Sequence, residues 1–353
     1  MFTQLQMKNL TVFQQADLDL SQGLNVFVGE NGSGKTHVLK AAYCIAASLS
    51  PNGDRRYTDT PSKSGLQSAI ADKLTRVFRP ESLGRIVRKR QRERCELAAW
   101  FSLKGLDCAF SLATQSKSEV SLERVPKRWS DVIPAYIPTR EILSLYPGFV
   151  SVYESRYLEF DETYRDLCLL LGAPALRGPR EDRVKRLLQP LEKAMGGSVF
   201  LDKNGRFYLK MTGQGNMEMP LVAEGVRKLA MLARLVVTGT FLDKGVLFWD
   251  EPDTSLNPKL ITGVARFIME LTKNGVQVFI ATHSLFLMRE LEILHQREDY
   301  RNVPARFFAL HPKDEGVVAQ GGDSLDDLDP IDSLDEELSQ SDRYMELQQE
   351  TQF

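Results

Sequence analysis

The amino-acid sequence predicts an α/β fold with N-terminal antiparallel strands, a parallel core sheet and a mixed α/β insertion. Three segments support this prediction. An apolar run leads into a glycine-rich loop at 24–36, a second ends in two carboxylates at 245–251, and a third ends in a histidine at 276–283. The opening, 2–10, alternates apolar and polar residues before the short stretch 18–20, which is typical of a half-buried antiparallel pair.

The loop at 29–36 reads Gly-Glu-Asn-Gly-Ser-Gly-Lys-Thr, the GxxxxGK[ST] pattern of a phosphate-binding P-loop, or Walker A motif. It lies between a predicted strand and a predicted helix at 37–48. Its glycines allow backbone N–H groups to point at phosphate, Lys35 would bridge the β and γ phosphates, and Thr36 would offer its hydroxyl to Mg²⁺. We therefore expect ATP and Mg²⁺ as ligands. The expected ATP-binding residues are Gly29, Glu30, Asn31, Gly32, Ser33, Gly34, Lys35, Thr36 and His37.

The apolar run at 245–250 is typical of a buried parallel strand and ends in Asp250 and Glu251, as a Walker B strand does. We expect Asp250 to hold Mg²⁺ together with Thr36, and Glu251 to orient the attacking water. The next predicted strand, 276–281, ends just before His283, which can reach a γ-phosphate or its water. The predicted activity is hydrolysis of ATP to ADP and phosphate, with Glu251 and His283 as catalytic residues.

Together these motifs resemble the ATP-binding cassette (ABC) superfamily, and the resemblance covers roughly residues 1–50 and 205–310. More narrowly, the chain resembles the non-transporter branch that includes SMC proteins, RecF-type repair proteins and the AAA-family ATPases of OLD-like bacterial anti-phage systems. In that branch 255–258 would be the D-loop and His283 the switch histidine.

The resemblance also implies a signature loop, which opens a helix and caps the γ-phosphate bound by a partner subunit. The candidate is 223–228, Ala-Glu-Gly-Val-Arg-Lys, which departs from the transporter form LSGGQ. Gly225 would allow close backbone approach, and Arg227 or Lys228 would add positive charge in trans. We expect Glu224, Gly225, Arg227 and Lys228 to act on a second copy, so that the chain forms an ATP-sandwich dimer or a higher homo-oligomer. An ordinary helix start with solvated Arg and Lys remains the alternative.

The stretch 51–204 is longer than a minimal nucleotide-binding domain needs. Helices are predicted at 66–78, 153–171 and 181–195, and strands at 95–101, 106–112 and 132–137. The absence of a long heptad run excludes an SMC-style coiled-coil arm. We predict an ATPase domain split between 1–50 and 205–312, an inserted lid or partner-binding region at 51–204, and a loosely ordered acidic C-terminal tail at 313–353.

The formal net charge of −2 conceals two opposite local biases. The stretch 73–94 is rich in Lys and Arg, and is either a solvated face or a surface for the phosphates of DNA or RNA. Acidic residues predominate from 314 onward. The four scattered cysteines are expected to be buried thiols. The sequence contains neither a signal-peptide layout nor the roughly 20 consecutive apolar residues that a membrane helix needs, so we expect a cytoplasmic protein without a membrane partner.

Two biological roles fit such an ATPase. The resemblance favours a sensor, switch or scaffold for a separately encoded effector protein, a nuclease being one candidate, in bacterial anti-phage defence. The alternative is a RecF-like DNA-repair ATPase that binds DNA. A nucleotide-gated scaffold with little hydrolysis is a further alternative, against which the Glu251 carboxylate weighs.

Overall fold

The structure, a computed structural model, describes residues 1–50, 60–89, 94–155, 158–176, 181–241, 245–328 and 332–350. The strands of the described residues are β1 Phe2–Leu10, β2 Phe13–Asp19, β3 Leu24–Val28, β4 Cys95–Phe101, β5 Cys108–Leu112, β6 Ser121–Arg124, β7 Pro134–Ile137, β8 Gly197–Leu201, β9 Phe207–Met211, β10 Gly215–Glu218, β11 Val246–Asp250, β12 Gln277–Thr282, β13 Ala305–Lys313 and β14 Gly316–Gly322. The α-helices are α1 Lys35–Leu49, α2 Lys63–Phe78, α3 Phe149–Ser155, α4 Glu162–Gly172, α5 Glu181–Met195, α6 Glu224–Val237, α7 Pro258–Lys273, α8 Leu285–His295 and α9 Asp332–Glu350.

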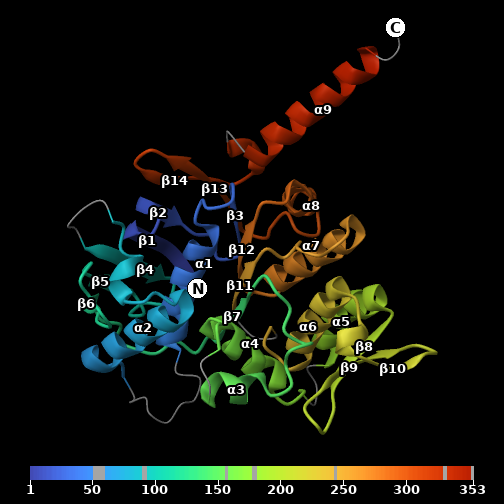
Figure 1. Cartoon of the computed structure of the whole chain (residues 1–353), viewed down its shortest axis with the longest axis horizontal. Helices are drawn as coiled ribbons and strands as arrows, with labels where there is room; N and C mark the ends of the chain where they lie inside the picture. The colour runs from blue at the N-terminus through green and yellow to red at the C-terminus, as the bar shows by residue number, and fades with distance from the viewer. Residues whose placement is uncertain are drawn as a thin grey trace.

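The core sheet has the order β14-β13-β3-β12-β11-β7 and runs through the middle of the molecule (Figure 1). Its strands are parallel except for β14, which pairs antiparallel with β13. The predicted α/β fold with a parallel core is therefore confirmed. Because carboxyl ends of parallel strands share one edge of a sheet, the loops that follow β3, β11 and β12 come together there.

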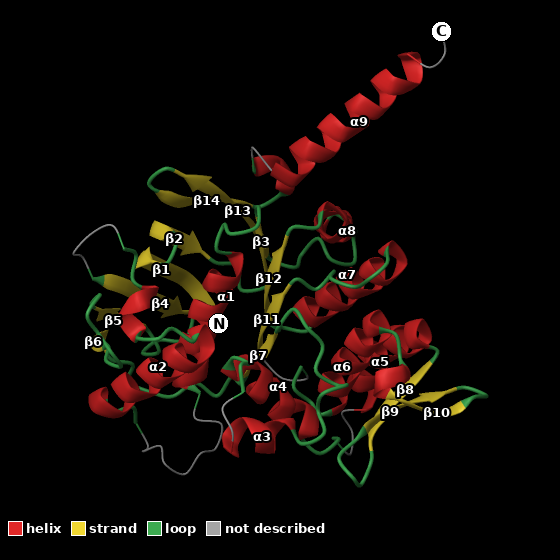
Figure 2. Ribbon diagram, viewed as in Figure 1, coloured by secondary structure: helices red, strands yellow, loops and turns green. Residues whose placement is uncertain are grey.

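Two layers cover the two faces of the core sheet (Figure 2). On β12, Val278 and Ile280 pack into a cluster with α6, α7 and α8, while Phe279 and Ala281 pack into a second cluster with α1 and the antiparallel sheet. This alternation follows from the two-residue repeat of a strand. The continuous apolar pattern of the core strands thus reflects burial on both faces.

The strands do not follow the expected boundary at residue 51. β4, β5 and β6 extend the antiparallel sheet of β1 and β2, in the order β2-β1-β4-β5-β6, and β7 is an edge strand of the core sheet beside β11. Much of 51–204 is therefore part of the two sheets that carry the motifs. Strand periodicity shows which residues are buried, but it does not show which strand a segment pairs with.

Two further expectations differ from the structure. The helix predicted at 153–171 is divided into α3 and α4, because Asp161 caps a new helix by accepting a 3.0 Å hydrogen bond from Thr163 N. The tail expected to be loosely ordered from 313 begins instead with β14, which pairs with β13 along its length, and ends with α9, which projects away from the sheets (Figure 1).

All four cysteines are free and buried, as predicted. Burial raises the pKa of each thiol, including that of Cys168 to about 12, so these are packed side chains rather than reactive thiolates. Among the described residues, no helix combines the length and apolar character that crossing a membrane requires.

Candidate functional site

The P-loop joins β3 to α1 and holds a buried lysine. Lys35 Nζ donates hydrogen bonds to the carbonyl oxygens of Gly29, at 2.7 Å, and Glu30, at 2.9 Å. Burial lowers the pKa of Lys35, although nearby carboxylates oppose the shift. The Ser33 side chain is fully buried, and its hydroxyl has no hydrogen-bond partner among the described residues. An ammonium group and an unpaired buried hydroxyl in one loop fit a ligand that brings acceptor oxygens, such as a phosphate.

Gly34 is required at its position for two reasons. Its φ of 90° lies in the left-handed region, which favours glycine. A Cβ there would also lie 2.6 Å from Val12 and 2.7 Å from Phe13. Phe13 is fully buried, so it belongs to the core that supports the loop. The P-loop is therefore backed by the β1–β2 turn.

Thr36 and Asp250 face each other across the site. Thr36 Oγ1 lies 3.1 Å from Asp250 Oδ1 and 2.9 Å from Oδ2, and donates to this carboxylate. Tyr136, on β7, donates to Oδ2 at 3.4 Å, a contact that the sequence did not reveal. Burial raises the pKa of Asp250 to about 6, while the hydrogen bond from Thr36 acts in the opposite direction. A hydroxyl and a carboxylate are hard oxygen donors, so this pair fits Mg²⁺.

Glu251 and His283 are adjacent at the same edge of the sheet. Glu251 N donates to Ala281 O at 2.8 Å, and His283 Nδ1 lies 2.7 Å from Glu251 Oε2. Glu251 has a φ of 50°, a conformation that costs a non-glycine residue roughly 1–3 kcal/mol and is concentrated at functional sites. The strand ends thus bring together the two residues that the sequence predicts to be catalytic.

Asp253 is a third acidic group at this position, which the sequence analysis missed. It accepts a 2.6 Å hydrogen bond from Thr282 Oγ1, and ligand atoms of Glu251, Asp253 and His283 lie within 4.8 Å of one another. In the sequence, only the position of Asp253 two residues after Glu251 could have indicated that it belongs to the site. The cluster concentrates negative charge beside the P-loop, where a bound cation would offset it.

The signature candidate occupies the start of α6, which begins at Glu224, an exposed residue. Gly225 lies so close to the loop after β11 that a Cβ would be 2.8 Å from Ser255 O. Glycine is therefore needed here for contact within the chain, whatever it does across an interface.

Arg227 and Lys228 bind to groups within their own chain. Lys228 is 1% exposed, and its Nζ donates to the carbonyl oxygens of Thr254, at 2.8 Å, and Glu251, at 3.3 Å. Arg227 Nε donates to Glu141 Oε1 at 2.6 Å. These contacts differ from the expectation that either cation is available to a partner's phosphate. No local pattern marks Glu141 as the partner of Arg227, because their contact spans 86 residues.

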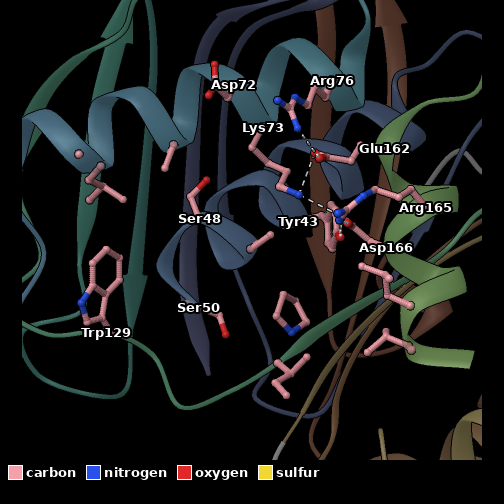
Figure 3. Close-up of a pocket in the computed structure, with 18 of the residues that line it drawn as sticks. Tyr43, Ser48, Ser50, Asp72, Lys73, Arg76, Trp129, Glu162, Arg165 and Asp166 are labelled. Carbon is pink, nitrogen blue, oxygen red and sulfur yellow. Dashed lines mark hydrogen bonds and ion pairs between the residues drawn. The ribbon is translucent and has the colours of Figure 1, made fainter. Parts of the chain in front are cut away.

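The basic stretch at 73–94 is not one continuous positive face. Figure 3 shows Lys73 and Arg76 of α2 turned toward carboxylates of α4, around a cavity of about 590 Å³. Lys73 Nζ lies 2.8 Å from Glu162 and 2.9 Å from Asp166, and Arg76 lies 3.3 Å from Glu162. Residues 90–93, with two of the arginines, lie outside the described residues. Lys73 and Arg76 are therefore paired with carboxylates of their own chain.

Two family models match the chain. Residues 4–93 match one described as "AAA domain", and residues 133–289 match one described as "AAA domain, putative AbiEii toxin, Type IV TA system".

Among curated proteins, the DNA replication and repair protein RecF of Streptococcus uberis is 38% identical over 78 residues, which are 21% of this chain and 20% of that protein. RecF of Streptococcus suis is 39% identical over 46 residues, 13% of each chain. The match thus spans at most about a fifth of these relatives.

Solved SMC head structures share the fold. One, bound to the C-terminal winged-helix domain of ScpA, has a TM-score of 0.55 at 14% identity, covering 91% of this chain and 97% of the other. Another, with an extended coiled coil and bound to a ScpA C-terminal domain from Pyrococcus furiosus, has a TM-score of 0.56 at 14% identity, covering 92% and 96%.

The P-loop, the Walker B carboxylates and the histidine meet at one edge of a sheet whose fold is that of an SMC head. The AAA-domain matches and the RecF segments agree with this arrangement. In its motifs, its two AAA-domain segments and its fold, the chain resembles the ABC-superfamily ATPases of the SMC/RecF branch.

Proposed function

We propose that this protein binds ATP with Mg²⁺, hydrolyses it at a site completed by a second copy, and uses the ATP-bound state as a switch for a separately encoded effector protein. The observation that carries the proposal is the convergence of Lys35, Thr36, Asp250, Glu251 and His283 on one edge of the core sheet. These are the groups that phosphoryl transfer to water requires.

Each group has a role that follows from its position. The P-loop N–H groups and Lys35 would hold the phosphates, and Thr36 and Asp250 would hold Mg²⁺, which would supply positive charge to offset that of the phosphates. Glu251, which follows β11 directly and has a left-handed backbone conformation, would orient water. His283, whose side chain is 54% exposed, is accessible both to Glu251 and to the γ-phosphate. The proposal includes a role for 51–204 as a lid or partner-binding region.

The biological role that we favour is anti-phage defence. It is supported by the family model over 133–289, whose description names a toxin of a type IV toxin–antitoxin system, a class in which two gene products act together. The effector, a nuclease or another toxic enzyme, would bind the closed ATP-bound assembly. Co-purification of the protein with the product of a neighbouring gene, dependent on ATP, would test this assignment.

Hydrolysis is tested by Glu251→Gln, which keeps the side-chain shape and removes the carboxylate. We expect ATP binding to persist, phosphate release to fall about 100-fold, and an ATP-dependent assembly to accumulate. Phosphate release and sedimentation velocity measure the two effects. Glu298→Gln, at an exposed position in the α8–β13 connection, is the matched control. Phosphate release at the wild-type rate in Glu251→Gln would exclude Glu251 as the water-orienting group.

The composite site is tested by mixing two inactive variants, Lys35→Ala and Ala223→Asp. A substitution at Gly225 would disturb its own chain, whereas Ala223 is the exposed N-cap of α6 and makes no side-chain cap hydrogen bond. Aspartate there caps the helix within its own chain, a gain of about 1 kcal/mol, but places negative charge against a partner's γ-phosphate. Ala223→Ser caps without charge and is the control.

The mixed dimer holds one site with an intact P-loop and an intact α6 start, so part of the activity should return on mixing. Activity equal to the plain sum of the two variants would mean that α6 does not act in trans. Hydrolysis would then proceed within one subunit.

The second candidate function, a RecF-like DNA-repair ATPase, is favoured by the RecF matches. Its test is the double variant Arg85→Glu with Lys89→Glu, at two exposed positions. The variant should bind duplex DNA more weakly, and the slope of log affinity against log salt should fall by the equivalent of about two phosphate contacts. Arg301→Glu, elsewhere on the surface, is the control. Equal salt slopes in the reversed and native proteins would leave the stretch as a solvated face.

A further inference from the structure

A groove of about 700 Å³ lies between α5 and α7, on the side of the molecule away from the antiparallel sheet. Its floor is apolar and includes Leu187, Pro190, Leu260 and Phe267. Gly263, in the middle of α7, also lines it, and a Cβ built there meets nothing within 4 Å. The groove is therefore open above Gly263 and has the shape of a seat for a further helix.

Cations border this groove with a regular spacing. On α7, the exposed residues Lys259 and Arg266 line the groove, and the exposed Lys273 lies at its end, over the ring of the lining residue Tyr300. The three cations follow one another at intervals of seven residues, so they form one stripe along the helix. Lys193 of α5 stands on the opposite side. Glu270 is the one acidic residue among the described residues that line the groove, and it accepts a 2.6 Å hydrogen bond from Tyr300.

The chain itself contains a helix of complementary charge. The segment 332–350, which forms α9, has seven acidic residues and one arginine, a net formal charge of −6. All of its described side chains are exposed, including Met345 at 60%. α9 has 19 residues and is about 28 Å long, while α7 has 16 residues and is about 24 Å long. The two helices are therefore similar in length. Figure 1 shows that it points away from its own body.

We propose that α9 of one copy docks in the α5–α7 groove of a second copy. Its acidic side chains lie against the stripe of Lys259, Arg266 and Lys273, and Met345 packs on the apolar floor. Charged residues that flank an apolar seam are what sets partner choice between helices. This contact goes beyond the ATP sandwich, because neither element binds nucleotide. It adjoins that site, since α7 begins directly after the loop that Lys228 holds.

A nucleic acid fits the same groove less well. A phosphate backbone would pair with the cations but would not desolvate the floor of Leu187, Leu260 and Phe267, which an apolar helix face covers. The seven-residue spacing of the cations also matches the repeat of a docked helix.

The test uses two full-length charge-reversal variants without nucleotide. The groove variant carries Lys259→Glu and Arg266→Glu, and the tail variant carries Asp342→Lys and Glu346→Lys; all four native side chains are exposed, so the fold does not depend on them. Sedimentation equilibrium at low salt measures self-association. Each variant alone should dimerise about tenfold or more weakly than the native chain, while an equimolar mixture should regain native affinity. Arg297→Glu with Arg301→Glu is the control for net charge.

A second pair of variants tests the floor without changing charge. Gly263→Leu fills the groove and should weaken association about as much, whereas Gly263→Ala leaves most of it open and should have little effect. A chain that carries all four charge reversals, Lys259→Glu and Arg266→Glu in the groove and Asp342→Lys and Glu346→Lys in α9, should again self-associate.

Three results would overturn the proposal. Native affinity in the groove and tail variants would show that the elements do not meet. Rescue in the combined chain but not in the mixture would place α9 on its own groove. Loss of duplex DNA binding by the groove variant, with native self-association, would assign the cations to nucleic acid. Because association is measured without nucleotide, failure here is separate from failure of the ATPase experiments.

Discussion

Lys35 and Lys228 are buried ammonium groups near the carboxylates Asp250 and Glu251, and both donate to backbone carbonyl oxygens. Lys35 lies in a loop whose N–H groups and unpaired hydroxyl suit phosphate, so a ligand can take over its hydrogen bonds. Lys228 instead holds the loop after β11 to the start of α6. The same residue type is therefore placed to meet a phosphate ligand in one loop and positions a loop in the other.

Lys35→Ala should reduce ATP affinity at least about tenfold, because the phosphate charge would lose its compensating ammonium group in a partly buried site. Isothermal titration with ATP and Mg²⁺ measures the effect. Lys40→Ala, one turn further along α1, pairs with Asp161 and is the control. Undiminished ATP affinity in Lys35→Ala would contradict the assignment of the P-loop.

Lys228 should make stability depend on pH at alkaline values. Burial lowers its pKa to about 8 from an ordinary value of 10.5, so between these values the unfolded chain binds more protons than the folded one. The free energy of unfolding should therefore rise from pH 8 to pH 10.5, by roughly 3 kcal/mol at most. Urea denaturation at several pH values would measure this rise in the native protein, and Lys228→Met should lack it. An equal rise in both proteins would assign the effect to other groups.

At the scale of elements, one buried glutamine joins the two sheets. Gln277 begins β12, where the next four residues are apolar, and is fully buried. Its Oε1 accepts from Phe2 N at 2.8 Å, and its Nε2 donates to Phe2 O at 2.8 Å and to Ser21 O at 2.7 Å. The start of β1 is thus held to the core sheet through a side chain, because the two strands belong to different sheets.

Gln277→Leu should destabilise the protein by roughly 3 kcal/mol, since the buried N–H and C=O of Phe2 lose this partner, while Ser21 O keeps its hydrogen bond from Asn25 Nδ2. The free energy of unfolding from urea denaturation is the measurement. Gln15→Leu, on the exposed face of β2, should change it by less than about 0.5 kcal/mol. A similar small change at both positions would mean that water replaces the lost amide.

At the scale of the whole molecule, α4 is connected to α1 and α2 by buried charges (Figure 3). Tyr43 donates to Asp166 at 2.6 Å, and Lys73 pairs with both Asp166 and Glu162. Glu162 is 6% exposed, so this pairing is shielded from water. The network ties the helix that follows the P-loop, together with α2, to α4.

Lys73→Met should cost about 3 kcal/mol, because two carboxylates lose their buried partner. Arg76→Met, whose side chain is 60% exposed, should cost less than about 1 kcal/mol. Adding Glu162→Gln and Asp166→Asn to Lys73→Met should recover most of the loss in urea denaturation. No recovery would show that packing of the lysine chain, rather than its charge, stabilises the network.

The parts of the site that the sequence predicted are those held within short motifs. Lys35 and Thr36, and likewise Asp250 and Glu251, are neighbours in the chain, and the strand that carries each pair has a clear apolar pattern. Tyr136 and Asp253 escaped prediction, and so did the pairing of Glu141 with Arg227. Tyr136 and Glu141 reach the site or α6 from over 80 residues away, and no local pattern marks such a contact.

The sequence by itself determined the parallel core, the nucleotide loop and the order of strands that carry carboxylates and histidine, because these depend on local spacing and on burial with a two-residue repeat. Only the tertiary structure decided the rest. It placed β4–β7 in the two sheets and turned the acidic tail into β14 and α9. It also showed Arg227 and Lys228 bound within their own chain. Pairing partners and burial of a charge depend on residues distant in sequence, whose proximity is created by folding itself.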